Sequence, residues 1–365
     1  MADEKSALKP RSDLAIEMML PTATESARGL VMTGKLLEAH LKLLLASQAA
    51  AKASGPESPE ALAAENDLGV VRFLLGRHGE SEEGFRKVLA VMEKDKGKDQ
   101  VQGKDQEKEK GPGSPAASDP PGTADPVGFL APLSNLGFAL NDGFKYEEAT
   151  EIRRRALACA EAAFPSDPAA VAGHVANLGV SVGMRGDFEE AKALFERAVD
   201  MASGPLGPGS PYVIFANDGL GFVLARLDDQ PRALEVLRAN LKAATDAFGE
   251  FHPLSVTAFA HVADALGKQE LRHIPKEVRE EIVDLLMRAH SGAAKCYGPN
   301  SPETHAYGSE LGSAVADRGD PIGGERIAQK AFSSLARLLR PADPRVRRAK
   351  TILTAIQNMR NTQRK

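Results

Sequence analysis

The stretch NLGVSVGMRGDFEEAKALFERAV, residues 177–199, recurs along the chain and decides the fold. Its Leu178 has counterparts at Leu136 and Leu220, 42 residues to either side, and an alanine follows each of these leucines after 13 residues. A fixed internal period indicates an array of structural repeats rather than a globular domain. The 365 residues are therefore expected to form one continuous array.

Each repeat has the pattern of two amphipathic helices, which we name helix A and helix B. Helix A is expected to begin at a proline after Ser, Asp or His, because Ser and Asp cap helices and proline at the first helical position loses no hydrogen bond. Turns at glycines such as Gly76 and Gly186 are expected to end helix A. The prolines that predict six A helices and one final helix are Pro59, Pro126, Pro168, Pro211, Pro253, Pro302 and Pro344.

This pattern resembles tetratricopeptide repeats, and more narrowly the kinesin-light-chain-like subclass with its 42-residue repeat. The resemblance rests on the Asn-Leu-Gly starts, on Gly-Asp-Phe-Glu-Glu-Ala at residues 186–191, and on Gly-Pro-x-Ser-Pro loops at residues 55–59, 207–211 and 298–302. It implies an all-α, right-handed α-solenoid of about seven tetratricopeptide-like helix pairs. A C-terminal capping helix is expected to cover the last apolar face.

Departures from the period set the predicted boundaries. Residues 93–124 are first charged and then rich in Pro, Gly and Ser, which predicts a disordered low-complexity insertion. The alternating charges also favour an extension of the preceding helix by a turn or two. A seven-residue excess at 267–275 is interpreted as a tolerated loop insertion. The predicted segments are an N-terminal tail at 1–11, two helix pairs at 12–92, the insertion at 93–124, five pairs at 125–342, and the capping helix with a basic tail at 343–365.

Composition excludes several classes of protein. No run reaches the roughly 18 apolar residues of a membrane span, and the N-terminus lacks the apolar core of a signal peptide. Two cysteines, Cys159 and Cys296, fit a reducing compartment. We therefore expect no membrane association and a cytoplasmic location, or an organellar one if the sequence is a processed form. The net charge of −4 disfavours a nucleic-acid partner, with RNA at the basic C-terminus as the alternative.

No catalytic or metal-binding pattern stands out. The eight histidines are scattered, and His252 is expected to cap a helix. The string Gly-Val-Ser-Val-Gly at 179–183 has the spacing of a nucleophile elbow, but the repeat register places Ser181 in the middle of helix A, where that turn cannot form. The basic clusters at 153–155 and 340–350 are expected to be solvated helix faces. We predict no enzyme activity, no catalytic residue, no metal site and no cofactor.

The resemblance implies a concave groove lined by the A helices, with side chains near the Asn of Asn-Leu-Gly facing it. An Asn amide there both donates and accepts hydrogen bonds, which suits a peptide backbone. The alternatives are that Asn135 and Asn177 only bridge helices and that Phe138 and Phe222 belong to the core. The predicted partner-binding residues are Asn135, Phe138, Asp142, Asn177, Phe215, Asp218, Phe222, Arg226 and His261.

Related repeats that bind chaperone tails grip a C-terminal carboxylate with Lys and Arg on successive A helices. The matching positions here carry no cation and are Asn66, Val70, Ala131, Ser134, Gly173 and Ala176. A clamp of that kind is not expected. We predict a non-enzymatic scaffold whose groove binds a peptide or protein surface. The alternatives are a permanent structural subunit of a cytoskeletal, ciliary or organellar assembly, and an RNA-associated helical-repeat protein.

Overall fold

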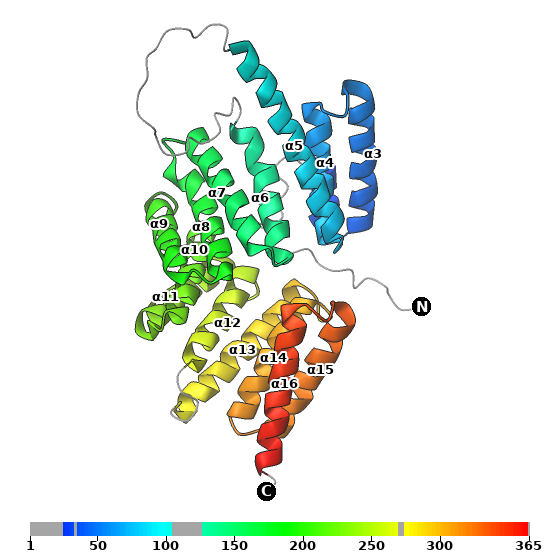
Figure 1. The fold of residues 1–365 in the computed structure, drawn as a ribbon. Helices are drawn as coiled ribbons and strands as arrows, with labels where there is room; N and C mark the ends of the chain where they lie inside the picture. Colours follow the sequence, from blue (N-terminus) through cyan, green and yellow to red (C-terminus); the bar gives the residue numbers. More distant parts are fainter. Residues whose placement is uncertain (1–24, 33–34, 104–125, 269–273, 364–365) are drawn as a thin grey trace. The chain divides into compact units, whose positions relative to one another are not determined.

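The computed structural model describes residues 25–32, 35–103, 126–268 and 274–363, and within them it contains fifteen α-helices and no strand (Figure 1). These helices are α2 Glu25–Met32, α3 Leu36–Ser54, α4 Pro59–Leu74, α5 His78–Gly103, α6 Pro126–Asp142, α7 Tyr146–Ala163, α8 Pro168–Arg185, α9 Phe188–Leu206, α10 Pro211–Arg226, α11 Gln230–Phe248, α12 Pro253–Gly267, α13 Lys276–Cys296, α14 Pro302–Asp317, α15 Pro321–Leu338 and α16 Pro344–Gln363.

The helices form seven A–B pairs, from α2–α3 to α14–α15, and α16 follows as the final helix. This architecture confirms the predicted all-α repeat fold. The described chain divides into two compact units, and the boundary between them in the sequence falls between Met201 and Ala202, within α9. Each unit is considered by itself below. In the described residues, every helix is too short or too polar to cross a bilayer.

The predicted helix starts are confirmed, since α4, α6, α8, α10, α12, α14 and α16 all begin at the expected proline. The side chains of Ser58, Asp167 and Ser301 accept hydrogen bonds from the backbone N–H three residues later, at 3.1–3.2 Å. The predicted cap His252 accepts from the backbone N–H of Leu254 through Nδ1 at 3.2 Å. Each bond satisfies a donor that the first helical turn would otherwise leave free.

A glycine on helix A brings the two helices of a repeat close together. In four successive repeats this glycine faces a buried side chain of helix B, so that an added Cβ would lie within about 3.2 Å of it. We call the helix-B residue the contact position. The four pairs are Gly69 with Phe85, Gly137 with Arg153, Gly179 with Phe195, and Gly221 with Leu237. The glycines of the Asn-Leu-Gly pattern are therefore explained by packing.

The turn from helix A to helix B needs a left-handed backbone two residues before helix B begins. Gly76, Gly186 and Gly319 provide it with φ of 77°, 105° and 114°. Phe144 and Asp228 hold the same place in their repeats with φ of 61°. Because side chains with a Cβ rarely adopt this conformation, these two turns carry backbone strain that the glycine turns avoid.

The two segments that depart from the repeat period lie partly outside the described residues. Helix α5 continues to Gly103, eleven residues into the segment 93–124 and further than the turn or two that its charge pattern indicates. The rest of that segment lies outside the described residues, so its predicted disorder stays a prediction. Of the excess at 267–275, residues 269–273 also lie outside the described chain. The predicted tail at 1–11 and the start of the first pair lie outside it as well.

Candidate functional site

The predicted partner-binding residues fall into two groups, one in each compact unit. In the unit up to Met201, α6 carries Asn135, Phe138 and Asp142, and α8 carries Asn177. In the unit from Ala202, α10 carries Phe215, Asp218, Phe222 and Arg226, and α12 carries His261. Each group is described separately.

In the first group, the asparagines are held inside the helix array. Asn135 is buried, and its Nδ2 donates to Asn66 Oδ1 at 3.2 Å, which joins α6 to α4. Asn177 is buried too. Asn141 makes a similar bridge that the sequence did not single out, donating to Ser181 Oγ at 3.0 Å between α6 and α8. Asn135 thus bridges two helices, which was the alternative to ligand binding. Contact of Asn135 or Asn177 with a ligand stays a prediction.

Phe138 and Asp142 are half-buried and contact polar side chains of helix-B residues. Asp142 Oδ2 lies 3.3 Å from His78 Nδ1. The Phe138 ring lies under the guanidinium of Arg153, whose Cζ is 4.7 Å from the ring centroid. Arg153 is only 2% exposed, so the prediction that residues 153–155 form a solvated face is wrong at this position. Burial lowers the pKa of the Arg153 guanidinium to about 10. The reason is the repeat register, which places Arg153 at the contact position facing Gly137.

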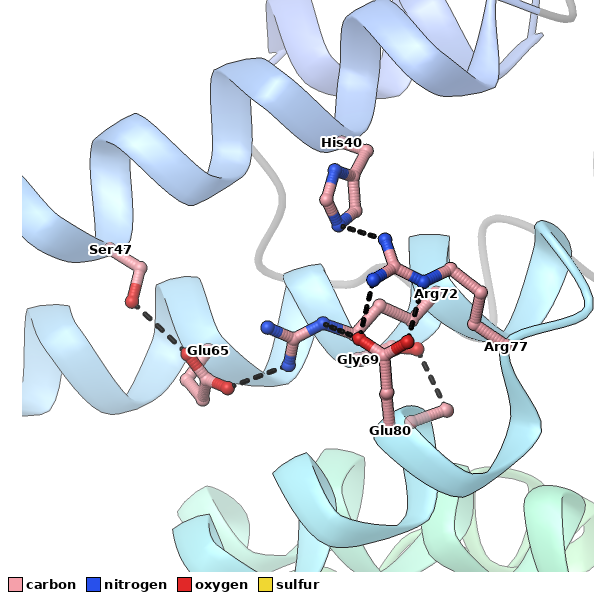
Figure 2. Close-up of polar contacts among 8 residues, drawn as sticks. His40, Ser47, Glu65, Gly69, Arg72, Arg77 and Glu80 are labelled. Carbon is pink, nitrogen blue, oxygen red and sulfur yellow. Dashed lines mark hydrogen bonds and ion pairs between the residues drawn. The ribbon is translucent and has the colours of Figure 1, made fainter.

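A polar network links α3, α4 and α5 in the same unit (Figure 2). Glu65 accepts from Arg72 Nη1 at 2.9 Å, and Glu80 accepts from Arg77 Nη2 at 2.6 Å. Arg77 Nη1 also lies 3.1 Å from Nε2 of His40, and burial together with the neighbouring Arg77 lowers the pKa of that histidine. Because the charges in this network are matched within it, we assign it to helix packing rather than to ligand binding.

The second group lies at a cavity of about 450 Å³ in the unit from Ala202. Its walls come from the A helices α10, α12 and α14, from α13, and from Arg348 of α16. Phe222, Arg226 and His261 line it, and Asp218 contacts the lining residue His261. Phe215 does not line it. The structure therefore brings together four of the five residues predicted in this unit.

One wall of the cavity is an aromatic and charged cluster. His261 Nδ1 lies 2.9 Å from Asp218 Oδ1, and the His261 and Phe222 rings are 5.5 Å apart. Arg226 extends over the Phe222 ring, with Cζ 5.0 Å from its centroid. Burial by itself lowers the pKa of His261, but the carboxylates of Asp218 and then Asp264 outweigh it, so the pKa is raised. The Asp218 carboxylate therefore favours the protonated, imidazolium form of His261.

Polar groups are also found among the other lining residues. Burial raises the pKa of Tyr307 to about 12, so its hydroxyl stays protonated. Arg279 Nε donates to the backbone carbonyl of Ile274 at 3.1 Å, and Arg348 Nη2 donates to Glu310 Oε2 at 2.9 Å. The cavity thus combines paired charges with apolar wall residues such as Ile274. Such a site can enclose an apolar side chain while polar groups at its edge bind a peptide backbone.

Sequence reasoning missed several wall residues. They are Asp264, Lys268, Ile274, Arg279, Tyr307, Glu310, Asp317 and Arg348. The available signal was the seven-residue excess, because Lys268 and Ile274 flank residues 269–273 and both line the cavity. Lys268 Nζ also donates to the backbone carbonyl of Ala225 at 2.9 Å. The insertion that was interpreted as a tolerated loop therefore contributes to the wall of the candidate site.

No constellation for catalysis or metal binding appears around these positions. Ser181 is buried within α8, as its register predicts. Across the described part of the chain, no group of three or more His, Cys, Asp and Glu side chains is placed to hold a metal ion. Neither Cys159 nor Cys296 forms a disulfide bond in the described part of the chain.

The sequence model of the tetratricopeptide repeat family matches residues 133–169 and 171–212. The chain contains tetratricopeptide repeats. Its second match spans one full 42-residue unit, the repeat length of the kinesin-light-chain-like type, and the starts of α6, α8, α10 and α12 follow one another at 42 or 43 residues. No curated protein sequence matches this tetratricopeptide repeat protein.

Rap proteins of low sequence identity share this fold. The apo form of RapI is 11% identical and has a TM-score of 0.60, covering 86% of this chain and 96% of its own. A Rap protein complexed with Competence and Sporulation Factor is 9% identical with a TM-score of 0.58, covering 97% of this chain and 88% of its own. The putative kinesin light chain repeats of Podosopora anserina are 18% identical with a TM-score of 0.44, covering 58% and 97%.

Proposed function

We propose that this tetratricopeptide repeat protein is a non-enzymatic scaffold that binds a peptide segment of a partner protein at the cavity between α10, α12 and α14. The observation that carries the proposal is the cavity itself. Its volume of about 450 Å³ is within the range of about 300–1,000 Å³ that is usual for ligand sites. Helix A of three successive repeats contributes to it, which supports the proposal that the A helices bind the ligand.

The wall chemistry indicates the kind of ligand. Ile274, Ile282 and Leu286 offer an apolar surface, while Tyr307 and Arg226 offer hydrogen-bond donors. The ligand should therefore insert one apolar side chain and place its backbone against the polar groups. A fold relative that is complexed with Competence and Sporulation Factor supports ligand binding by this architecture.

The test fills the cavity without changing the fold. Ser313 lines the cavity on α14, and Ser333 is exposed on α15 in the same unit, so Ser313→Trp and Ser333→Trp are a matched pair. Tagged full-length protein is purified from its native cells and the bound proteins are identified by mass spectrometry. We expect the partner to be lost from Ser313→Trp and retained by Ser333→Trp, with equal helical circular dichroism for both variants. Equal retention of the partner would count against this site.

The structure also bears on the alternatives. On α16, Arg345, Arg348 and Arg360 pair with glutamates of α14 and α15, so much of the basic C-terminal charge is neutralised within the protein. This favours a protein partner over RNA.

Size-exclusion chromatography of the native complex addresses the permanent-subunit alternative, since such a subunit would never elute free. A protein that elutes only in one fixed complex and tolerates Ser313→Trp would support it.

A further inference from the structure

One repeat has a charged residue at the contact position, where the other three have an apolar one. In three of the four repeats this helix-B residue is apolar: Phe85 and Leu237 are fully buried, and Phe195 is 2% exposed. In the pair α6–α7 the same position is Arg153, also 2% exposed. The position that packs two helices together thus holds a cation in one repeat only among these four.

Arg153 lacks the partner that a buried cation normally has. Its Nε is buried with no hydrogen-bond partner, and among the described residues no carboxylate forms an ion pair with its guanidinium. Its neighbour Arg154 is exposed and pairs with Glu151 at 2.7 Å and with Glu190 at 2.9 Å. The Arg153 guanidinium packs against the Phe138 ring. A buried unpaired charge is destabilising, so the helix pair would pack better with the Phe or Leu of its neighbours.

The guanidinium packs against helix α6. Phe138, against which it packs, is a half-buried residue of α6. His174 of α8 is also half-buried, and burial together with the charge of Arg153 lowers its pKa. Gly137 leaves the space for the arginine to pass, since an added Cβ would lie 3.0 Å from Arg153 Cγ.

We propose that Arg153 receives a carboxylate of a peptide segment that binds beside α6, within the unit up to Met201. The planar guanidinium fork matches a carboxylate with two parallel hydrogen bonds, and the ligand would supply the anion that the protein lacks. The carboxylate comes from an Asp or Glu side chain or from the peptide C-terminus. This cation comes from helix B, unlike the A-helix clamp that the sequence lacks. The inference rests on the proposed peptide-binding function.

The experiment uses the full chain and a synthetic pool of random twelve-residue peptides. The immobilised protein selects binders, and the best binder is then made in three forms: the free acid, the C-terminal amide, and a form with Asn or Gln in place of Asp or Glu. Affinities are measured by fluorescence anisotropy for the wild type, Arg153→Leu and the matched control Arg154→Leu. Arg153→Lys serves as a second variant, because it keeps the charge and removes the fork.

For the wild type and Arg154→Leu, we expect one of the neutralised peptides to bind at least about tenfold more weakly than the free acid. Whether it is the amide or the Asn/Gln form identifies the source of the carboxylate. Arg153→Leu should bind the free acid equally weakly, should no longer distinguish the three forms, and should melt at or above the wild-type midpoint. Arg153→Lys should lie between the wild type and Arg153→Leu in affinity.

Each other outcome is informative. If peptides bind but neutralisation weakens the wild type and Arg153→Leu by the same factor, the carboxylate proposal fails while the proposed function stands. If Arg153→Leu does not fold, the same comparison is made with Arg153→Lys, and an unchanged preference for the acid overturns the proposal. If no peptide binds the wild type, both the proposed function and this inference fail.

Discussion

Gly221 offers a sharp test of the close helix contact. An added Cβ at Gly221 would lie 2.4 Å from Cγ and Cδ2 of Leu237, which is fully buried. Overpacking of this kind costs about 1–3 kcal/mol, while replacing a helical glycine with alanine gains about 1 kcal/mol. Gly221→Ala should therefore lower the free energy of unfolding by up to about 2 kcal/mol. At Gly179 the Cβ would be 3.2 Å from the Phe195 ring, so Gly179→Ala should be close to neutral.

The decisive comparison repeats Gly221→Ala with Leu237 shortened. Leu237→Ala alone should cost about 2–5 kcal/mol, because it leaves a cavity in a fully buried contact. In that background the new methyl group meets open space, so Gly221→Ala should stabilise the protein by about 1 kcal/mol. The sign of the effect thus reverses between the two backgrounds.

The assay is urea unfolding followed by far-ultraviolet circular dichroism, since the chain contains no Trp for fluorescence. The four proteins of the cycle are the wild type, the two single variants and the double variant. A destabilisation by Gly221→Ala that is equal in both backgrounds would refute the reasoning. It would mean that the alanine acts on the backbone of α10 and not through Leu237.

Three further predictions concern caps, turns and pH. Ser301→Ala should lose about 1 kcal/mol of unfolding free energy, and Ser210→Ala, whose side chain makes no cap hydrogen bond, should lose less in the same urea assay. Asp228→Gly should gain about 0.5 kcal/mol by relieving its positive φ, whereas Gly186→Ala should lose about 1 kcal/mol. Burial and a neighbouring cation lower the pKa of His174 from 6.5 to about 4. Between these two pH values the unfolded chain binds a proton that the folded chain does not. The free energy of unfolding should therefore fall by up to about 3 kcal/mol as the pH drops from about 6.5 towards 4. His174→Gln should reduce this pH dependence when unfolding is measured at pH 5 and 7.5.

The repeat fold could be predicted from sequence because its signals are local. A proline behind a capping residue fixes a helix start through bonds that span three residues, so all seven predicted starts are confirmed. The capping role of His252 was predictable for the same reason. The glycine of Asn-Leu-Gly was recognised as a repeat marker, but its contact across the helix pair was not.

The candidate site was predicted only in part, because it depends on contacts between repeats. Phe222, Arg226 and His261 were found from their register on helix A and do line the cavity. Tyr307 was missed because its burial depends on neighbouring helices, and Ile274 because it follows a break in the period.

The period, the helix starts and the repeat class could be predicted from the amino-acid sequence, since these follow from bonds within a few residues. Which positions are buried and which charges are paired depends on contacts between helices, so the three-dimensional structure was needed to find them. Arg153 shows the difference: beside Arg154 and Arg155 it has the sequence pattern of a solvated face, yet it is 2% exposed. The physical reason is that burial depends on what the neighbouring helix offers, and Gly137 leaves room there for the arginine.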